Sequence, residues 1–167
     1  MSTRVRVGWP AALMGLAACA YNPLYPDVRS PAQHAHELDA RCMLAPEDAT
    51  AAALAPGVVE GVEPAYGTVQ SGNDRALRLR GARLHFRPEP GFSPESLHRS
   101  LECHEARVVT GRAPERPDDP YTLPGGWLDI DVTSAGDGFV VAVVTDDIPT
   151  ARRVLDRARR FAGGPAK

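Results

Sequence analysis

The sequence predicts an α+β domain in which three or four mostly antiparallel strands are covered on one face by helices. Two observations lead to this prediction. Segments with a helical apolar period are interspersed with segments in which apolar and polar residues alternate, as in half-buried strands. The resulting order is helix, weak strand, strand, helix, hairpin, helix, and its β-α-β-β-α core is typical of one sheet with helices on a single face.

The first predicted helix covers residues 31–44. Ser30 is a suitable cap, and Pro31 suits the first helical position. At about 100° per residue, one stripe is apolar and should face the protein; it consists of Ala35, Leu38, Cys42 and Ala45. A second short helical piece is expected before Pro56 and Gly57.

Two strands are predicted next. Residues 58–70 have β-branched residues broken by Gly and Pro, which favours an irregular or edge strand. In residues 75–88 the alternation is clearer, but its phase slips by one residue across Gly81 and Ala82. A bulge at this point would return both halves to one core face, formed by Leu77, Leu79, Leu84 and Phe86.

A helix is predicted from Pro94, after a Ser93 cap, to Gly111. Its main face contains Leu97, Leu101, His104 and Val108. Residues 112–126 follow as a long loop with four Pro and two adjacent Asp. Loops longer than about 12 residues are often functional or mobile.

Residues 127–147 contain the strongest hairpin signal, with a turn from Ala135 to Gly138. The first strand has an apolar face of Leu128, Ile130 and Val132 and a polar face of Asp129, Asp131 and Thr133. The chain then forms a terminal helix whose buried stripe is Ala151, Val154, Leu155, Ala158 and Phe161. This order suggests a ferredoxin-like variant that lacks the final strand and carries an extra first helix.

The N-terminal eighteen residues have the layout of a secretory signal, with Arg4 and Arg6 before a short apolar run. The run ends in Leu16-Ala17-Ala18-Cys19 and here resembles the bacterial lipoprotein family. The resemblance implies cleavage before Cys19, diacylglycerol on its sulfur and an acylated amino terminus. Ala20 in place of Asp implies, by the same resemblance, the outer membrane, facing the periplasm or the cell surface.

Three regions are therefore expected: a signal peptide (1–18), a lipidated tether (19–30) and a single α+β domain (31–164). Loss of Arg4 and Arg6 with the signal leaves 17 basic and 21 acidic residues, a balance of −4. A mildly acidic chain of this kind is a poor candidate for nucleic acid. Membrane contact through acyl chains on Cys19 is the first expected interaction.

Cys42 and Cys103 are left as a pair in an oxidising compartment, and we predict a disulfide between them. The alternative is a transition-metal site. His98 and Glu102 are spaced i, i+4 on one helix and could grip an ion together, with Cys103 or His104 as further ligands. A solvated helix face has the same composition, and His104 on the apolar face is typical of a core histidine.

Other constellations are weaker. A calcium site would need Asp118, Asp119, Asp129 and Asp131 to gather, and their spacing matches no calcium loop. The terminal helix carries Arg152, Arg153, Arg157, Arg159 and Arg160 on its outer face, which could meet an acidic envelope protein or anionic lipid; a plain solvated face is the alternative.

No catalytic residues are predicted, because the chain has no Gly-x-Ser-x-Gly elbow and no Gly-rich phosphate loop. The segments "GARLHFRPEPG", "LECHEAR" and "GDGFVVAV" resemble small, uncharacterised exported bacterial proteins, which implies no activity. We expect a lipid-anchored envelope protein with a non-catalytic binding or assembly role and no cofactor. A periplasm-facing metal-binding protein is the alternative, and a hydrolase is the least supported.

Overall fold

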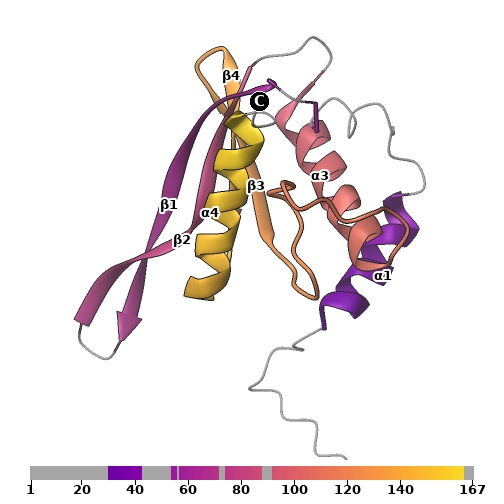
Figure 1. The fold of residues 1–167 in the computed structure, drawn as a ribbon, viewed down its shortest axis with the longest axis horizontal. Coiled ribbons are helices and arrows are strands. Elements are labelled where there is room, and N and C mark those ends of the chain that lie inside the picture. The colour runs from indigo at the N-terminus through magenta and orange to yellow at the C-terminus, as the bar shows by residue number, and fades with distance from the viewer. Residues whose placement is uncertain (1–29, 43–53, 56, 72–73, 88–91, 164–167) are drawn as a thin grey trace, which may run out of the picture.

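A computed structural model describes residues 30–42, 54–55, 57–71, 74–87 and 92–163. The order of elements agrees with the predicted one (Figure 1). The elements are α1 (Pro31–Cys42), β1 (Val59–Ser71), β2 (Asp74–Phe86), α3 (Pro94–Val109), β3 (Asp129–Ala135), β4 (Gly138–Val144) and α4 (Ile148–Gly163). The short helical piece expected before Pro56 falls mostly outside the described residues.

The four strands form one open sheet in the order β1-β2-β4-β3, and all neighbours are antiparallel. Since β2 and β3 both run antiparallel to β4, they are parallel to each other with β4 between them. This is the split β-α-β arrangement of ferredoxin-like folds. The edge beside β2, which a final strand would occupy in that fold, is filled by β1 from the N-terminal side.

Within the described ranges, the helices cover and bury one face of the sheet, as the sequence predicts. Its apolar side chains from β2, β4 and β3 meet those of α3 and α4 in a single core. These are Ala82, Leu84, Phe86, Val141, Val143, Ile130 and Val132 from the strands, with Leu97, Leu101, Val154, Leu155, Ala158 and Phe161 from the helices. Asp129, Asp131 and Thr133 are exposed on the opposite side of β3.

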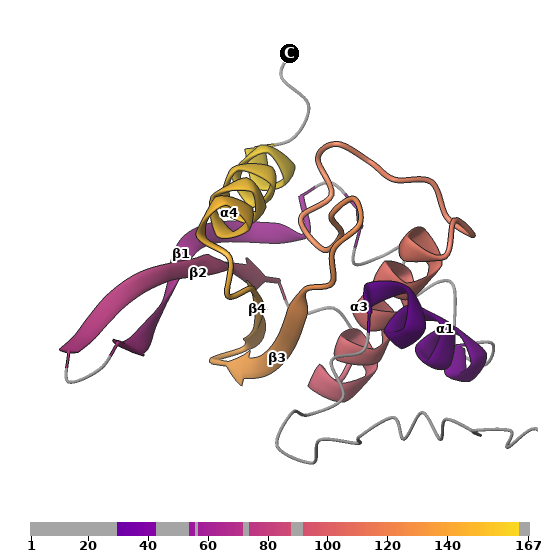
Figure 2. The same cartoon turned by 90° about the horizontal axis from the view of Figure 1, so that it is seen from below.

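The helices occupy different parts of the covered face. Helix α4 packs over β2 and β1, α3 packs beside β3, and α1 lies against α3 (Figure 2). Helix α3 begins with a capping box, in which Ser93 and Ser96 bond reciprocally to each other's backbone N–H. None of the helices in the described ranges is long and apolar enough to cross a membrane.

The predicted bulge is present, one residue earlier than expected. In the β1–β2 register Ala65 faces Gly81 and Tyr66 faces Leu79, so Arg80 is the extra residue. Leu79 returns to the core face and packs against the core. The prediction for Leu77 was wrong: its side chain is 70% exposed, because β2 runs on beyond the part of the sheet that the helices cover.

At Gly81, strand β2 passes close to the backbone of its neighbour β4. Its φ is +150°, and a Cβ placed on it would lie 2.0 Å from the carbonyl oxygen of Val143. A side chain has no room between these two strands, so the close pairing of β2 with β4 requires glycine here.

Candidate functional site

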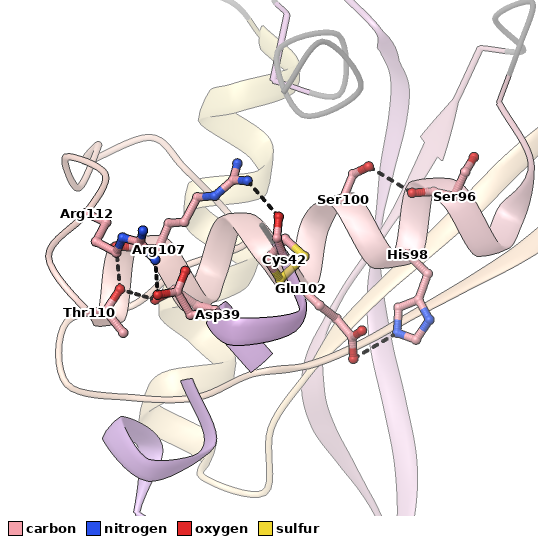
Figure 3. The surroundings of a disulfide bond; sticks show 11 residues. Asp39, Cys42, Ser96, His98, Ser100, Glu102, Arg107, Thr110 and Arg112 are labelled. Atoms are coloured by element: carbon pink, nitrogen blue, oxygen red, sulfur yellow. Dashed lines mark hydrogen bonds and ion pairs between the residues drawn. A yellow bond between two sulfur atoms is a disulfide. The ribbon is translucent and has the colours of Figure 1, made fainter. Parts of the chain in front are cut away.

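The predicted disulfide between Cys42 and Cys103 is present (Figure 3). The last residue of α1 is thereby joined to the middle of α3, with the two Cα atoms 5.5 Å apart. Both cysteines are buried where the two helices meet. The bond joins two residues that are 61 positions apart in the sequence. Helix α1 does not contact the sheet extensively, so the disulfide ties this helix to the rest of the domain.

Polar contacts reinforce the joint between α1 and α3. The guanidinium of Arg107 donates to the carbonyl oxygen of Cys42 at 3.3 Å. At the end of α3, Arg112 forms an ion pair with the mostly buried Asp39 of α1. Near the start of α1, the ring of His34 stacks on Trp127 with the ring centroids 4.4 Å apart. Helix α1 is therefore held near both of its ends as well as covalently.

The three residues predicted as metal ligands are not brought together. His98 Nε2 lies 3.3 Å from Glu102 Oε1 on the half-exposed side of α3, as the i, i+4 spacing predicts (Figure 3). His104 is buried on the other side of the helix and pairs with a different residue. Over the ranges that the structure describes, no three His, Cys, Asp or Glu side chains gather as a metal site.

His104 is a core histidine with a specific partner. Its Nε2 lies 2.6 Å from Oδ2 of Asp119, which comes from the loop after α3. The other carboxylate oxygen of Asp119 accepts the backbone N–H of Tyr121 at 2.9 Å. Asp119 is therefore committed inside the protein, whereas Asp118 forms a half-exposed ion pair with Arg116. The four aspartates weighed as calcium ligands, all of them described, do not form one cluster.

Glu105, next to His104 on α3, is completely buried. One carboxyl oxygen accepts the backbone N–H of Leu128 at 2.7 Å, and the other finds no partner among the described residues. Burial raises the pKa of this carboxyl to about 9, which outweighs the opposing effect of the Leu128 hydrogen bond; the nearby Asp119 raises it further. Glu105 is therefore a neutral acid at physiological pH.

The middle of the loop between α3 and β3 is part of the core and is not an exposed, mobile segment. This part is fully buried, and Tyr121 and Leu123 pack with the sheet and α4. Figure 2 shows the loop filling the space between α3 and α4. The hydroxyls of Tyr121 and Thr122 are buried without a hydrogen-bond partner within the described part of the chain.

Arg157 holds this loop from α4. Its guanidinium donates to the carbonyl oxygen of Thr122 at 2.9 Å and pairs with Glu115 at 3.1 Å. Its side chain is 13% exposed, so the prediction that places it on the outer face of the helix was wrong. The other four arginines of that prediction are exposed: Arg152, Arg153, Arg159 and Arg160. They are called the arginine face of α4 below.

Sequence reasoning missed Glu105, Tyr121, Thr122 and Arg157 as members of one buried polar cluster with His104 and Asp119. A signal was available in the loop itself. The run "PYTLP" is apolar and aromatic for a segment otherwise rich in Pro and charge. Such residues seldom stay exposed together, so they indicate a loop that packs on the core.

An open hollow of about 440 Å³ lies at one end of the sheet, lined in part by Glu60, His85, Arg87 and Asp137. Arg87 Nε donates to Glu60 Oε1 at 2.9 Å within it. Residues 88–91, which directly follow Arg87, are outside the described residues. The hollow therefore carries no assignment.

No family model, curated protein or solved structure matches the chain. The functional interpretation therefore rests on the residues themselves, and two kinds of site stand out. One is the buried polar cluster around His104 and Asp119, in which these two residues pair with each other and Arg157 holds the loop. The other is the exposed arginine face of α4.

Proposed function

We propose that this protein is a lipid-anchored, non-catalytic component of the cell envelope, held in the outer membrane by acyl chains on Cys19. The basic start, the apolar run and the small residues before Cys19 support this proposal. The Cys42–Cys103 disulfide also supports it, because such bonds persist in oxidising compartments. Cys19 itself lies outside the described residues.

The binding role assigned to the domain is recognition of an acidic protein partner by the arginine face of α4. The observation that carries it is the division of this helix into two faces. Its apolar stripe is locked into the core, while four arginines are exposed on a rigid support. Guanidinium groups form paired hydrogen bonds with carboxylates, which suits them to acidic protein surfaces.

The anchor is tested by changing Cys19 to Ala and following the protein in its own host. The variant should no longer incorporate a fatty-acid label, and it should leave the membrane fraction. Ala20→Ser is the matched control and should still carry lipid. An unlabelled parent protein, or a Cys19→Ala variant that still carries lipid, would refute the anchor.

The partner is tested with a photo-crosslinking residue at Arg153 and, as control, at Arg99 on the exposed side of α3. Crosslinking in living cells should give a discrete adduct from position 153 only. Reversing the charge of Arg159 and Arg160 should weaken that adduct several-fold. Adducts of equal yield from both positions, or none from position 153, would rule out recognition by this face.

A further inference from the structure

Strands β1 and β2 continue past the rest of the sheet as a two-stranded projection. The partner strand β4 pairs with β2 only from Gly81 to Phe86, so the preceding residues of β2 pair with β1 alone. The projection, called the β1–β2 arm, consists of residues 66–71 and 74–79. Figure 1 shows it extending to the lower left, past the N-terminal end of α4. Arg80 closes its base by bonding the carbonyl oxygen of Thr145 and Asp146.

The arm carries the large apolar side chains that the described protein leaves exposed. These are Tyr66, 52% exposed, and Leu77, 70% exposed, one from each strand. Tyr66 faces Leu79 and Thr68 faces Leu77, so Tyr66 and Leu77 lie on the same face of the ribbon as diagonal neighbours. Leu79 on that face packs against the core. An apolar surface thus continues from the core onto the arm, where no other described element covers it.

Positive charge accompanies this apolar face. Arg75 lies on the same face as Leu77, two residues along the strand, and Arg78 lies on the opposite face. Both residues are exposed, and neither forms an ion pair with another of the described side chains, in contrast to Arg80. The segment from Tyr66 to Leu79 contains one acid, Asp74. Aromatic and aliphatic side chains flanked by arginine are the composition of surfaces that enter the headgroup region of a bilayer.

The arm also extends toward the same side of the domain as the start of α1, from which the chain leads back to Cys19. In Figure 1 the tip of the arm and the start of α1 extend to the same level, below α4 and below the loop after α3. Residues 20–30, which lead from Cys19 to the cap of α1 and include Ser30, are eleven residues. A segment of this length spans at most about 35–40 Å. An anchored domain therefore stays close enough to the bilayer for the arm to reach it.

We propose that the β1–β2 arm is a second membrane contact, in which Tyr66 and Leu77 enter the interfacial region and Arg75 and Arg78 bind the phosphates of anionic lipids. This inference rests on the proposed anchor at Cys19. The anchor keeps the arm near the surface, which raises the occupancy of a contact that the arm also makes without it. Together the two contacts orient the domain, whereas a flexible tether alone leaves it free to rotate.

The experiment uses the oxidised chain from Ala20 onward, which contains every described element and carries no acyl group. Binding is measured by sedimentation with vesicles of phosphatidylethanolamine and phosphatidylglycerol, and with vesicles of phosphatidylcholine alone. The protein should sediment with the anionic vesicles and be released by salt. Arg75→Gln with Arg78→Gln should lower the partition coefficient at least about tenfold, since each basic residue near an anionic surface contributes about 1 kcal/mol.

Two further variants separate the arm from general charge. Arg41→Gln with Arg99→Gln removes the same charge from exposed positions on α1 and α3 and should leave most of the binding intact. Tyr66→Trp adds a second indole to a chain that otherwise retains only Trp127. Relative to the parent, its emission should shift to the blue on anionic vesicles and be quenched by brominated lipid chains. Binding that both double variants reduce equally, or an added emission that brominated lipid leaves unchanged, would overturn the proposal.

These outcomes are independent of acylation. Failure of vesicle binding would therefore overturn the second contact and leave the anchor at Cys19 standing. If, in addition, the arm variants abolished a photo-crosslink from position 66 to one protein in cells, the arm would be a protein-binding surface instead of a lipid contact.

Discussion

Nε2 of His104 lies 2.6 Å from Oδ2 of Asp119, and neither side chain is more than 7% exposed. This pair fixes the loop after α3 to the helix that precedes it. Asp119→Ala would leave His104 and the backbone N–H of Tyr121 without their acceptor inside the core. We expect a loss of about 3–5 kcal/mol in the free energy of unfolding, measured by urea denaturation.

Asp118→Ala is the matched control for that variant, because it removes the neighbouring carboxylate from a half-exposed ion pair. Its cost should stay below about 1 kcal/mol. If the two variants lose the same stability, the buried pair does not hold the loop.

The disulfide should contribute strongly to stability, because it closes a long stretch of chain. Changing both Cys42 and Cys103 to Ser should lower the free energy of unfolding by about 4 kcal/mol in the chain-entropy model. The reducing agent that lowers the stability of the parent should have no effect on this double variant. The prediction would be contradicted if reduction freed both thiols of the parent protein and left its unfolding midpoint unchanged.

The buried carboxyl of Glu105 should give the stability of the protein an unusual dependence on pH. The pKa of its carboxyl is 4.5 in the reference state and about 9 in the folded protein, so between these values folding takes up a proton. The stabilising effect of the bound proton is complete below pH 4.5 and is lost as the pH rises toward 9, by up to about 1.4 kcal/mol per pH unit.

Glu105→Gln keeps an acceptor for the N–H of Leu128 and carries no charge. It should flatten the decline in stability between about pH 6 and pH 9, measured by urea unfolding across that range. Glu102→Gln, on the half-exposed side of the same helix, should keep the decline of the parent. Parallel pH profiles for Glu105→Gln and the parent would show that Glu105 is ionised in the folded protein.

Gly81 and Gly61 offer a matched pair in the sheet. Gly81→Ala would place a methyl group 2.0 Å from the carbonyl oxygen of Val143 and should cost about 3 kcal/mol or more. The nearest atom to a Cβ on Gly61 is 3.9 Å away, so Gly61→Ala should change stability by about 0.5 kcal/mol or less. Thermal unfolding of both variants checks this, and equal melting temperatures would contradict it.

Much of the fold could be predicted from local pattern. Caps such as Ser93 and Pro94, the buried stripe of α4 and the alternation in β3 depend on neighbours close in the sequence, and these predictions were confirmed. The strand order could not be read in the same way. Pairing of β2 with β4 brings together residues that are far apart in the sequence, and nothing in either segment specifies its partner.

The candidate sites also divide into features that the sequence predicted and features that depend on distant parts of the chain. The joining of Cys42 to Cys103 followed from the number of cysteines and the expected compartment, and it was confirmed. Arg157 could not be distinguished from its arginine neighbours, because its role depends on a loop distant in the sequence folding back onto α4. Leu77 was assigned to the core since alternation marks the face of a strand but not where the covering helices end.

The joint between α1 and α3 determines how a pull on the N-terminal side of the chain reaches the domain. Force applied before Ser30 enters α1 and passes through the sulfur–sulfur bond directly into the middle of α3. It bypasses the residues between the two cysteines, including both strands of the arm. Strands β1 and β2 then carry no direct tension, and a pull on the N-terminal side would have to break a covalent bond before it could unzip either of them.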